Sequence, residues 1–376
     1  MRISKLFKSL DYILLIVVGL ILVVGFFVLQ SATYNASIKY HVNYVNRQML
    51  WLAVSSVAFL CVLTVDYSKL SKYSIQIYLL NLGLLLAVLF FGTETKGAQA
   101  WIPIGPYKFQ PAEIVKILFI LGLAQFLRPR VGKLNRIRDL IPVFLYTGIP
   151  LVLILKQPDL GTGLVYVAIM FGMLLAAGAS PILLGVLFVG GIGIVSLAIY
   201  SHYTWGLPLP LKDYQLMRLV VFVNPMIDPR GSGWNIIQSQ IAVGSGGFFG
   251  KGWGLGSQTK GEFLPEQWTD FIFSVLAEEF GFIGSIILLI LFLLLIYRGI
   301  MIATKAKDVY GSLVAVGVVS MFTFHVLQNI GMTIGIMPIT GIPLPFVSYG
   351  GSALLANMIA LGLLMNVYIY HDRILF

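Results

Sequence analysis

Charged residues are scarce in this sequence. Asp, Glu, Lys and Arg make up 11% of the 376 residues, whereas hydrophobic residues make up 58%. A chain with so little charge cannot form a set of soluble domains, so the composition predicts a polytopic membrane protein. The single cysteine, Cys61, excludes a disulfide within these residues. The four histidines are scattered, and no HExxH, CxxC or Ser-His-Asp pattern supports zinc, thiol or triad chemistry.

Long apolar stretches predict ten transmembrane helices. A helix needs about 20 residues to cross the hydrocarbon core. Stretches of this kind occur at Tyr12–Gln30, Met49–Val65, Ser74–Gly92, Pro111–Leu127, Leu140–Leu155, Leu160–Ala177, Ile182–Tyr200, Phe271–Tyr297, Val309–Ile336 and Leu354–Tyr370. The predicted fold is an all-α polytopic membrane protein with one domain over residues 1–376 and a long extracytoplasmic loop, 202–270, between helices 7 and 8. Because nine stretches follow the first, we expect it to be an anchor and not a signal peptide.

The distribution of Lys and Arg predicts the orientation of the chain. With a cytoplasmic N-terminus, the inner segments hold 14 of the 25 basic residues, in short loops where the positive-inside rule applies. We therefore expect both termini in the cytoplasm and loop 202–270 outside. Anionic lipid at the inner face accounts for the net charge of +10. Nucleic-acid binding is not expected, because the basic residues form no patch interleaved with aromatic residues.

Ionisable residues collect at the outer ends of the predicted helices. The stretch that begins at Phe263 leads into the eighth helix, and Thr269 is a plausible N-cap, which would place Asp270 in the first helical turn. Acids in first turns are often only caps. Glu278 and Glu279 lie deeper, where each charge costs roughly 2.5–3.5 kcal/mol on insertion scales. We therefore favour a functional interpretation of this stretch.

Other polar residues allow two interpretations each. Glu113 and Lys116 lie on one face of a helix that starts at Pro111. They form either a self-neutralising ion pair or a polar face turned toward a cavity, which we favour because an isolated pair gains little in lipid. Arg47 either snorkels to the interface or belongs to a site. Asp159 either stabilises a tight outer turn or contributes to the same site.

Three outer loops are rich in Gly and Pro or in Gly and aromatic residues. Loop 93–110 is expected to be irregular, and loop 335–352 rigid and non-helical, buried in protein or lining a watery cavity. Loop 202–270 is expected to fold onto the membrane surface. Its glycines do not indicate a phosphate-binding loop, because no Walker Lys-Ser/Thr ending and no preceding strand accompany them.

Five motifs resemble those of the SEDS family (shape, elongation, division and sporulation proteins), and within it the RodA branch. They are Gly97-Ala-Gln-Ala-Trp101, Gln110-Pro-Ala-Glu-Ile-Val-Lys116, Gln157-Pro-Asp-Leu-Gly161, Phe263-Leu-Pro-Glu-Gln-Trp-Thr-Asp-Phe-Ile-Phe273 with Ala277-Glu-Glu279, and Pro338-Ile-Thr-Gly-Ile-Pro-Leu-Pro-Phe-Val-Ser-Tyr-Gly-Gly-Ser352. Two positions depart from the family pattern. Ala100 stands where arginine or serine is frequent, which puts a role for that side chain in doubt, and Ala112 removes only a hydroxyl at a helix start.

The resemblance implies a peptidoglycan glycosyltransferase of the bacterial cytoplasmic membrane. Such a protein polymerises lipid II into glycan strands on the outer face during cell elongation, by inverting transfer from a polyprenyl-diphosphate donor, and works with a class B penicillin-binding protein. The family pattern puts the catalytic aspartate at Asp270. The residues agree with this chemistry, because the transfer needs a base for the acceptor hydroxyl and cations for the departing diphosphate. The candidate diphosphate partners are Lys116, Arg47 and Arg218, alone or with a divalent cation (Mg or Mn).

The predicted substrate site contains further residues. They are Glu113, Asp159, Gln110 and Ser348. No metal ligand is assigned and no organic cofactor is expected. Lys116 is also a candidate partner for Asp270 across the cavity, which would keep that carboxylate ionised.

Two other functions fit parts of the sequence. A transporter that flips lipid II would share the spans and the buried charges, but internal repeats and polar groups near the bilayer midplane would then be expected. Here the ionisable residues collect at outer helix ends and no convincing repeat is found. A non-catalytic scaffold would leave the outward carboxylates and cations unexplained. Besides lipid II and the penicillin-binding protein, membrane lipid is an expected partner.

Overall fold

Every stretch predicted to span the membrane is helical in the computed structural model, which describes residues 9–371 except 96–97, 106 and 209–212. These helices are α2 (Tyr12–Ala32), α4 (Tyr44–Thr64), α6 (Ser74–Phe91), α7 (Pro111–Leu127), α8 (Ile137–Lys156), α9 (Leu160–Ala176), α10 (Pro181–Trp205), α14 (Ile272–Thr304), α15 (Val309–Ile334) and α16 (Gly351–His371). Among the described residues, eight helical stretches are long and apolar enough to cross a membrane. Helices α7 and α9 have 17 residues each. The all-α membrane fold is confirmed, and ten crossings remain a prediction.

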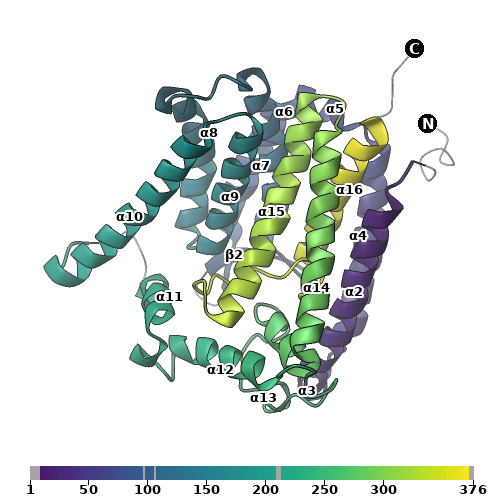
Figure 1. Ribbon diagram of the computed structural model, residues 1–376, viewed down its shortest axis with the longest axis vertical. Helices are drawn as coiled ribbons and strands as arrows, with labels where there is room; N and C mark the ends of the chain where they lie inside the picture. Colours follow the sequence, from purple (N-terminus) through teal and green to yellow (C-terminus); the bar gives the residue numbers. More distant parts are fainter. Residues whose placement is uncertain (1–8, 96–97, 106, 209–212, 372–376) are drawn as a thin grey trace.

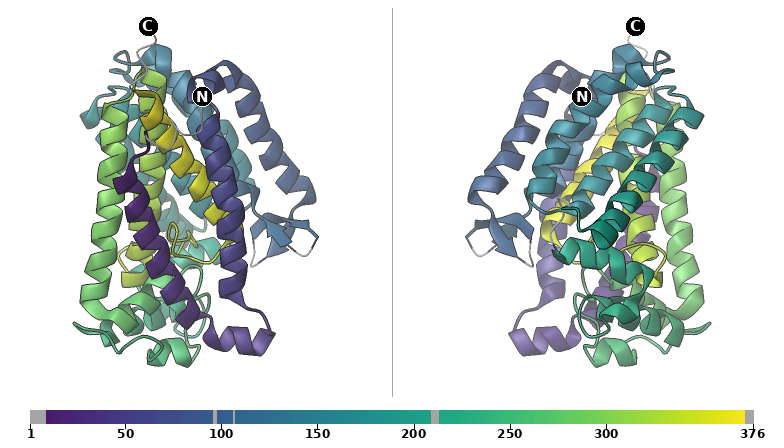
Figure 2. Two further views of the ribbon diagram at one scale, coloured as in Figure 1. Left: turned by 90° about the vertical axis from the view of Figure 1, so that its right-hand side faces the viewer. Right: turned by 90° about the vertical axis from the view of Figure 1, so that its left-hand side faces the viewer.

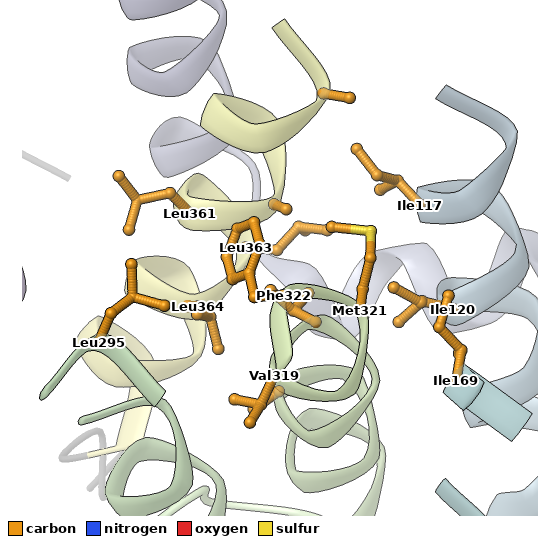
Figure 3. Packing of buried hydrophobic residues seen from close by; sticks show 14 of the residues in the cluster. Ile117, Ile120, Ile169, Leu295, Val319, Met321, Phe322, Leu361, Leu363 and Leu364 are labelled. Atoms are coloured by element: carbon orange, nitrogen blue, oxygen red, sulfur yellow. The ribbon is translucent and has the colours of Figure 1, made fainter. Parts of the chain in front are cut away.

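Helix α15 lies at the centre of the bundle. It packs against α7, α9, α14 and α16 (Figure 1). In the close view of the core, Met321 and Phe322 of α15 point toward side chains of α7 and α16 (Figure 3). Both residues are almost fully buried, at 1% and 0% exposure. Close packing of this kind fixes α15 and α16 relative to each other, so the loop between them, residues 335–350, starts and ends on a rigid frame.

Helix α10, unlike α15, lies at the edge of the bundle and is largely exposed. It slants away from the bundle (Figure 1), and only 6% of the residues in its most apolar stretch are buried. Ile182, Val189 and Ile194 are 80%, 68% and 71% exposed. Soluble monomers rarely expose contiguous apolar surface of this extent. The exposed side of α10 is therefore suited to lipid and not to water.

The two ends of the bundle differ. The start of α2 and the end of α16 lie at one end, and the short helices between α10 and α14 lie at the other (Figures 1 and 2). An even number of crossings would produce this arrangement. Arg2, Lys5, Lys8 and Arg373, which entered the orientation prediction, lie outside the described residues. Which end faces the cytoplasm remains a prediction.

The prediction of irregular structure for loop 93–110 is wrong. The loop contains an antiparallel three-stranded sheet of β1 (Thr93–Thr95), β2 (Ala98–Ile104) and β3 (Tyr107–Phe109). Thr93 pairs with Trp101, and Ile102 pairs with Phe109. Gly105 follows β2 with φ 58°, a left-handed conformation that suits a tight hairpin. Pro103 lies within β2 and Gly105 in the turn that follows it, so neither residue prevents regular structure here.

The described part of segment 206–271 contains several short helices. It contains α11 (Asp213–Val223), the 3-10 helix η3 (Pro225–Ile227), α12 (Ser232–Ser245) and α13 (Ser257–Lys260). The remaining short elements are α3 (Tyr34–Tyr40), α5 (Tyr67–Leu70), η1 (Ser71–Tyr73) and η2 (Arg128–Arg130). Helix α12 packs against both α14 and α15. The segment is therefore attached to the bundle by protein contacts.

Glu278 fixes this segment to α14. Its carboxylate is fully buried, and Oε1 accepts hydrogen bonds from Lys251 Nζ at 2.8 Å and from the Gln258 backbone N–H at 2.9 Å. Oε2 accepts from the backbone N–H and the hydroxyl of Thr259, at 3.1 and 2.9 Å. Donors from residues 251–259 of the segment therefore surround the carboxylate of Glu278. Glu278 has a structural role that its position in the sequence did not indicate.

We expect Glu278→Gln to loosen the turn around α13. The amide keeps one acceptor but turns its NH₂ group toward donors, so the loss of charge-assisted hydrogen bonds should cost about 2 kcal/mol. Limited proteolysis within residues 251–262 should become faster. The control is Glu262→Gln, because Glu262 lies 3.9 Å from Lys39 and both side chains are exposed, a pair worth about 0.5 kcal/mol. Equal cleavage of the two variants would contradict the role given to Glu278.

Candidate active site

A cavity of about 550 Å³ opens near the end of the bundle that carries α11–α13. Its walls come from the start of α4, the β-sheet, the turn before α9, helix α11, segment 266–270 and the loop between α15 and α16. Five predicted site residues line it: Arg47, Gln110, Asp159, Arg218 and Asp270. Residues more than 200 positions apart are thus brought to one space that holds both carboxylates and guanidinium groups.

A tight turn presents Asp270 to the cavity. Glu266 has φ 56°, and its carbonyl oxygen accepts the backbone N–H groups of Thr269, Asp270 and Phe271 at 3.1, 3.1 and 3.2 Å. Helix α14 begins only at Ile272, with Phe271 as its N-cap. The predicted N-cap role of Thr269 and the first-turn position of Asp270 are therefore wrong. Asp270 precedes the helix, because the turn at Glu266 uses the N–H groups that a helix start would have left free.

Three successive carbonyl groups fix this turn from outside. The carbonyl of Trp268 accepts the Tyr349 N–H at 2.9 Å, and that of Thr269 accepts the Ser348 hydroxyl at 2.6 Å. The carbonyl of Asp270 accepts Nδ2 of Asn329 at 2.8 Å. The loop after α15 and α15 itself thus hold the aspartate in place. Ser348, which also accepts the Leu344 N–H at 2.8 Å, is committed to backbone partners and not to the cavity predicted for it.

Asn329 links the two sides of the site. It is fully buried, and its Nδ2 also donates to the carbonyl of Ile342 at 2.8 Å. The loop 335–350 is non-helical, and Ile342, Leu344 and Phe346 in it are buried. Thr340, Gly341 and Pro343 line the cavity. The prediction that loop 335–352 is non-helical and either buried in protein or lining a cavity is confirmed for residues 335–350, whereas Gly351 and Ser352 belong to α16.

We expect Asn329→Leu to lower the turnover rate more than it changes KM for lipid II, the substrate that the family resemblance implies. The variant loses the hydrogen bonds to the carbonyls of Asp270 and Ile342, and a buried carbonyl left without a partner costs about 1–3 kcal/mol. The aspartate would then be held less firmly, although no group that contacts the cavity is removed. Turnover and KM with lipid II, together with thermal unfolding, measure both effects.

The matched control is Gln328→Leu on the neighbouring position. Gln328 is buried, and its Nε2 donates at 2.7 Å to the carbonyl of Pro338, which belongs to the same loop but lies away from Asp270. This variant should lose stability with a smaller loss of turnover. Equal loss of turnover in both variants would mean that Asn329 acts through general loop stability and does not position Asp270.

Lys116 lies in a buried cluster and does not line the cavity. Its Nζ donates to Glu113 Oε1 at 2.9 Å and lies 3.1 Å from His325 Nε2. The three side chains are 2%, 4% and 2% exposed. Among the described residues, the ion-pair partner of Lys116 is Glu113, so the predicted pairing of Lys116 with Asp270 is wrong. The self-neutralising pair, the interpretation we did not favour, is the one observed.

Asp159 is committed to helix α9. Oδ1 accepts the Thr162 N–H at 2.9 Å, and Oδ2 accepts the Thr162 hydroxyl at 2.8 Å. This arrangement is an N-cap in which both carboxylate oxygens are used. Asp159 lines the cavity but is bound as a structural residue. Gln110 is held through its backbone, whose N–H donates to Ser352 Oγ at 3.0 Å.

Two glycines let the walls come together at the aspartate. Gly341 has φ 72°, and a Cβ at this position would lie 3.2 Å from Asp270 Oδ2. A Cβ at Gly351 would lie 2.3 Å from Cε2 of Trp51. A side chain at either position would crowd the carboxylate or displace the indole ring. Gly341 therefore allows the loop to approach Asp270, and Gly351 allows the start of α16 to approach Trp51.

Comparisons with known proteins agree with this architecture. The sequence model of the family described as cell cycle protein, with the members FtsW, RodA and SpoVE, matches residues 11–373. This chain belongs to the FtsW/RodA/SpoVE family. It is 39% identical to stage V sporulation protein E of Bacillus subtilis (strain 168), with 96% of this chain and 98% of that protein covered. It is 35% identical to peptidoglycan glycosyltransferase RodA of Treponema pallidum (strain Nichols), with 96% and 98% covered.

A solved structure has the same fold as this FtsW/RodA/SpoVE protein. The TM-score is 0.80 at 32% identity, with 97% of this chain and 99% of that chain covered. That chain comes from a study of the structural coordination of polymerization and crosslinking by a peptidoglycan synthase complex. The family inferred from the five motifs is thus confirmed. Relatives named for rod shape and for sporulation have similar identities.

Several cavity residues of this FtsW/RodA/SpoVE protein were missed by the sequence analysis. Trp268 and Tyr349 form an aromatic wall with Tyr44, whose ring centroid lies 5.7 and 5.3 Å from theirs. Lys108 lines the cavity from β3. Trp268 stands two residues before Asp270, a proximity that could have suggested its place. Nothing in the sequence singled out Lys108, because its strand was not predicted.

Proposed function

We propose that this protein is a peptidoglycan glycosyltransferase that polymerises lipid II at the outer face of the cytoplasmic membrane. One observation carries the proposal: Asp270, Arg47 and Arg218 line a single cavity. A carboxylate and two cations in one space are the groups that a glycosyl transfer from a diphosphate donor needs. The curated name of the Treponema relative agrees with this activity.

In the proposed reaction, Asp270 is the general base. It takes the proton from the hydroxyl of the acceptor sugar while that oxygen attacks the anomeric carbon of the donor from the side opposite the diphosphate. The glycosidic bond forms as the bond to the phosphate oxygen breaks, so the configuration inverts and the polyprenyl diphosphate leaves. Arg47 and Arg218, with Lys108 from β3, offset the charge of the departing group.

The cavity residues fit a divalent cation that is bound jointly by protein carboxylates and the diphosphate of the substrate. Mg²⁺ at a diphosphate is usually held by one or two carboxylates together with phosphate oxygens and water. Asp270 and Glu266 both line the cavity and are the carboxylates that would hold it. No cluster of three or more His, Cys, Asp or Glu side chains occurs in the described part of the chain. A bound Mg²⁺ or Mn²⁺ would offset negative charge on the diphosphate, in addition to the arginines.

The proposal includes a partner and a cellular role. A class B penicillin-binding protein would cross-link the strands made here, in line with the peptidoglycan synthase complex that contains the structural relative. Both termini would be cytoplasmic and the cavity extracytoplasmic. Lipid II would reach the cavity from the bilayer, and the product would serve cell elongation.

Purified protein incubated with lipid II tests the proposal. We expect glycan strands that lysozyme degrades. If reconstituted protein instead moves lipid II across vesicles without forming polymer, it is a transporter. If neither process occurs with or without the penicillin-binding partner, the scaffold alternative is favoured and the proposal is wrong.

A further inference from the structure

One face of the first two turns of α4 is directed toward the Asp270 cavity. Tyr44, Arg47, Gln48 and Trp51 recur at spacings of three and four residues, which places them on the same side of the helix. Arg47 and Trp51 line the cavity. Gln48 lies between them in the sequence and is buried, at 3% exposure. The position of α4 therefore decides where its arginine stands in the cavity.

Gln48 joins α4 to the loop between α15 and α16. Its Nε2 donates to the carbonyl of Ser348 at 3.3 Å, and its Oε1 accepts the Gly350 N–H at 3.3 Å. The amide thus uses its donor and its acceptor on the two residues that flank Tyr349. A shift of α4 relative to this part of the loop would break both hydrogen bonds at once.

The same three loop residues, 348–350, also hold the turn of Asp270. The Tyr349 N–H donates to the carbonyl of Trp268 at 2.9 Å, and the Ser348 hydroxyl donates to the carbonyl of Thr269 at 2.6 Å. One side of this short piece of loop is therefore bonded to the segment that carries the aspartate, and the other side to the amide of α4. Hydrogen bonds connect the two walls of the cavity through only three residues.

Arg47 depends on this connection for its place. Its guanidinium group has no hydrogen bond or ion pair to another described residue. The backbone of α4 therefore determines where the charge can lie, and the neighbouring Gln48 is the polar residue that fixes this backbone to the loop. A misplacement of about 1 Å in a reacting assembly can lower the rate about 10²-fold, so the position of the helix matters for the reaction.

We infer that Gln48 is a positioning residue, which holds Arg47 at the distance from Asp270 that one bound donor requires. The inference rests on the proposed function, in which Arg47 offsets the charge of the departing diphosphate. Gln48 is not among the residues that line the cavity. Its effect on the substrate is therefore exerted through Arg47.

Binding of undecaprenyl diphosphate to the purified full-length protein tests the inference without turnover. Gln48→Met keeps the length and nearly the volume of the side chain but removes the amide donor and acceptor. We expect Gln48→Met and Arg47→Gln each to weaken binding about tenfold, the usual loss for one charge-assisted hydrogen bond. The double variant should bind no more weakly than Arg47→Gln, because Gln48 acts through the guanidinium group.

Three results of this cycle would overturn the inference. The first is wild-type binding by either single variant, and the second is no binding by the wild type. The third is a double variant about a hundredfold weaker than wild type, because the two effects would then be independent. If Gln48→Met does not fold, Gln48→Asn takes its place with the same expectations. That side chain is one methylene shorter, and with both bonds already 3.3 Å long it cannot keep the two together.

Gln328→Leu is the matched control for a loosened loop. Gln328 is also a buried glutamine bonded to this loop, at the carbonyl of Pro338, and it does not line the cavity. We expect this variant to lose thermal stability and to bind undecaprenyl diphosphate as wild type does. Binding weakened as much as in Gln48→Met would mean that any loosening of the loop has this effect, and the inference would be wrong.

Polymerisation of lipid II separates this inference from the proposed function. If the wild type makes glycan strands but the binding cycle of Gln48 and Arg47 is additive, the inference is wrong and the proposed function stands. If the cycle gives the expected result but the protein makes no polymer, the proposed function is wrong, and Gln48 still positions Arg47 for a diphosphate.

Discussion

Asp270→Asn should reduce polymerisation of lipid II by about 10²–10⁴-fold, the usual contribution of a general base. The amide has nearly the same shape as the carboxylate but cannot take up the acceptor proton. The fold should be kept, because asparagine retains the backbone hydrogen bonds from its carbonyl to Asn329 and from its N–H to Glu266. The initial rate with lipid II, measured at matched amounts of monodisperse protein, gives the effect.

The control for Asp270→Asn is Asp66→Asn, the same change of a carboxylate to an amide at a site outside the cavity. Asp66 is the N-cap of α5, and its Oδ1 accepts the Ser68 N–H at 3.0 Å. Asparagine is an equally good N-cap, so Asp66→Asn should keep both stability and activity. A polymerisation rate within a few-fold of wild type in Asp270→Asn would exclude Asp270 as the base and would shift attention to Glu266.

The membrane helices could be predicted from the sequence because length and hydropathy decide them. The motif at Asp270 and the rigid loop after α15 were also found, since prolines, glycines and acids are conspicuous in apolar surroundings. The sheet at 93–109 was missed because two of its three strands, β1 and β3, have only three residues and leave hardly any periodic pattern, and because its hydrogen bonds are made between segments. The same holds for α12, whose position depends on packing against α14 and α15.

The sequence predicted least well which polar residues have a structural role and which line the cavity. Glu278 and Asp270 are acids of one motif. The buried carboxylate of Glu278 accepts five hydrogen bonds, whereas Asp270 lines the cavity. Sequence spacing cannot separate these cases, because the donors around Glu278 come from a loop whose path was unknown. Lys116 was assigned to the diphosphate for the same reason. Its charge was visible in the sequence, but His325 at 3.1 Å was not.

Lys116→Met should have the second large effect, and on stability in the first place. The substitution leaves the carboxylate of Glu113 buried without its cation, which typically costs about 3–5 kcal/mol. It also removes a donor from His325, which has to accept with Nε2 because an ammonium group can only donate. Thermal unfolding in detergent should show a clear decrease of Tm, and polymerisation should decrease with the amount of folded protein.

The double variant Glu113→Gln/Lys116→Met separates structure from catalysis. Replacing both members of a buried pair by neutral groups is often close to neutral for stability, so the double variant should regain most of the Tm lost by Lys116→Met. If Lys116 serves only the cluster, polymerisation per folded protein returns together with Tm. If Tm returns while polymerisation stays low, the ammonium acts on the substrate, and the cluster would have to open toward the cavity during turnover. The described geometry, with Lys116 2% exposed and bound to Glu113 and His325, favours the first result.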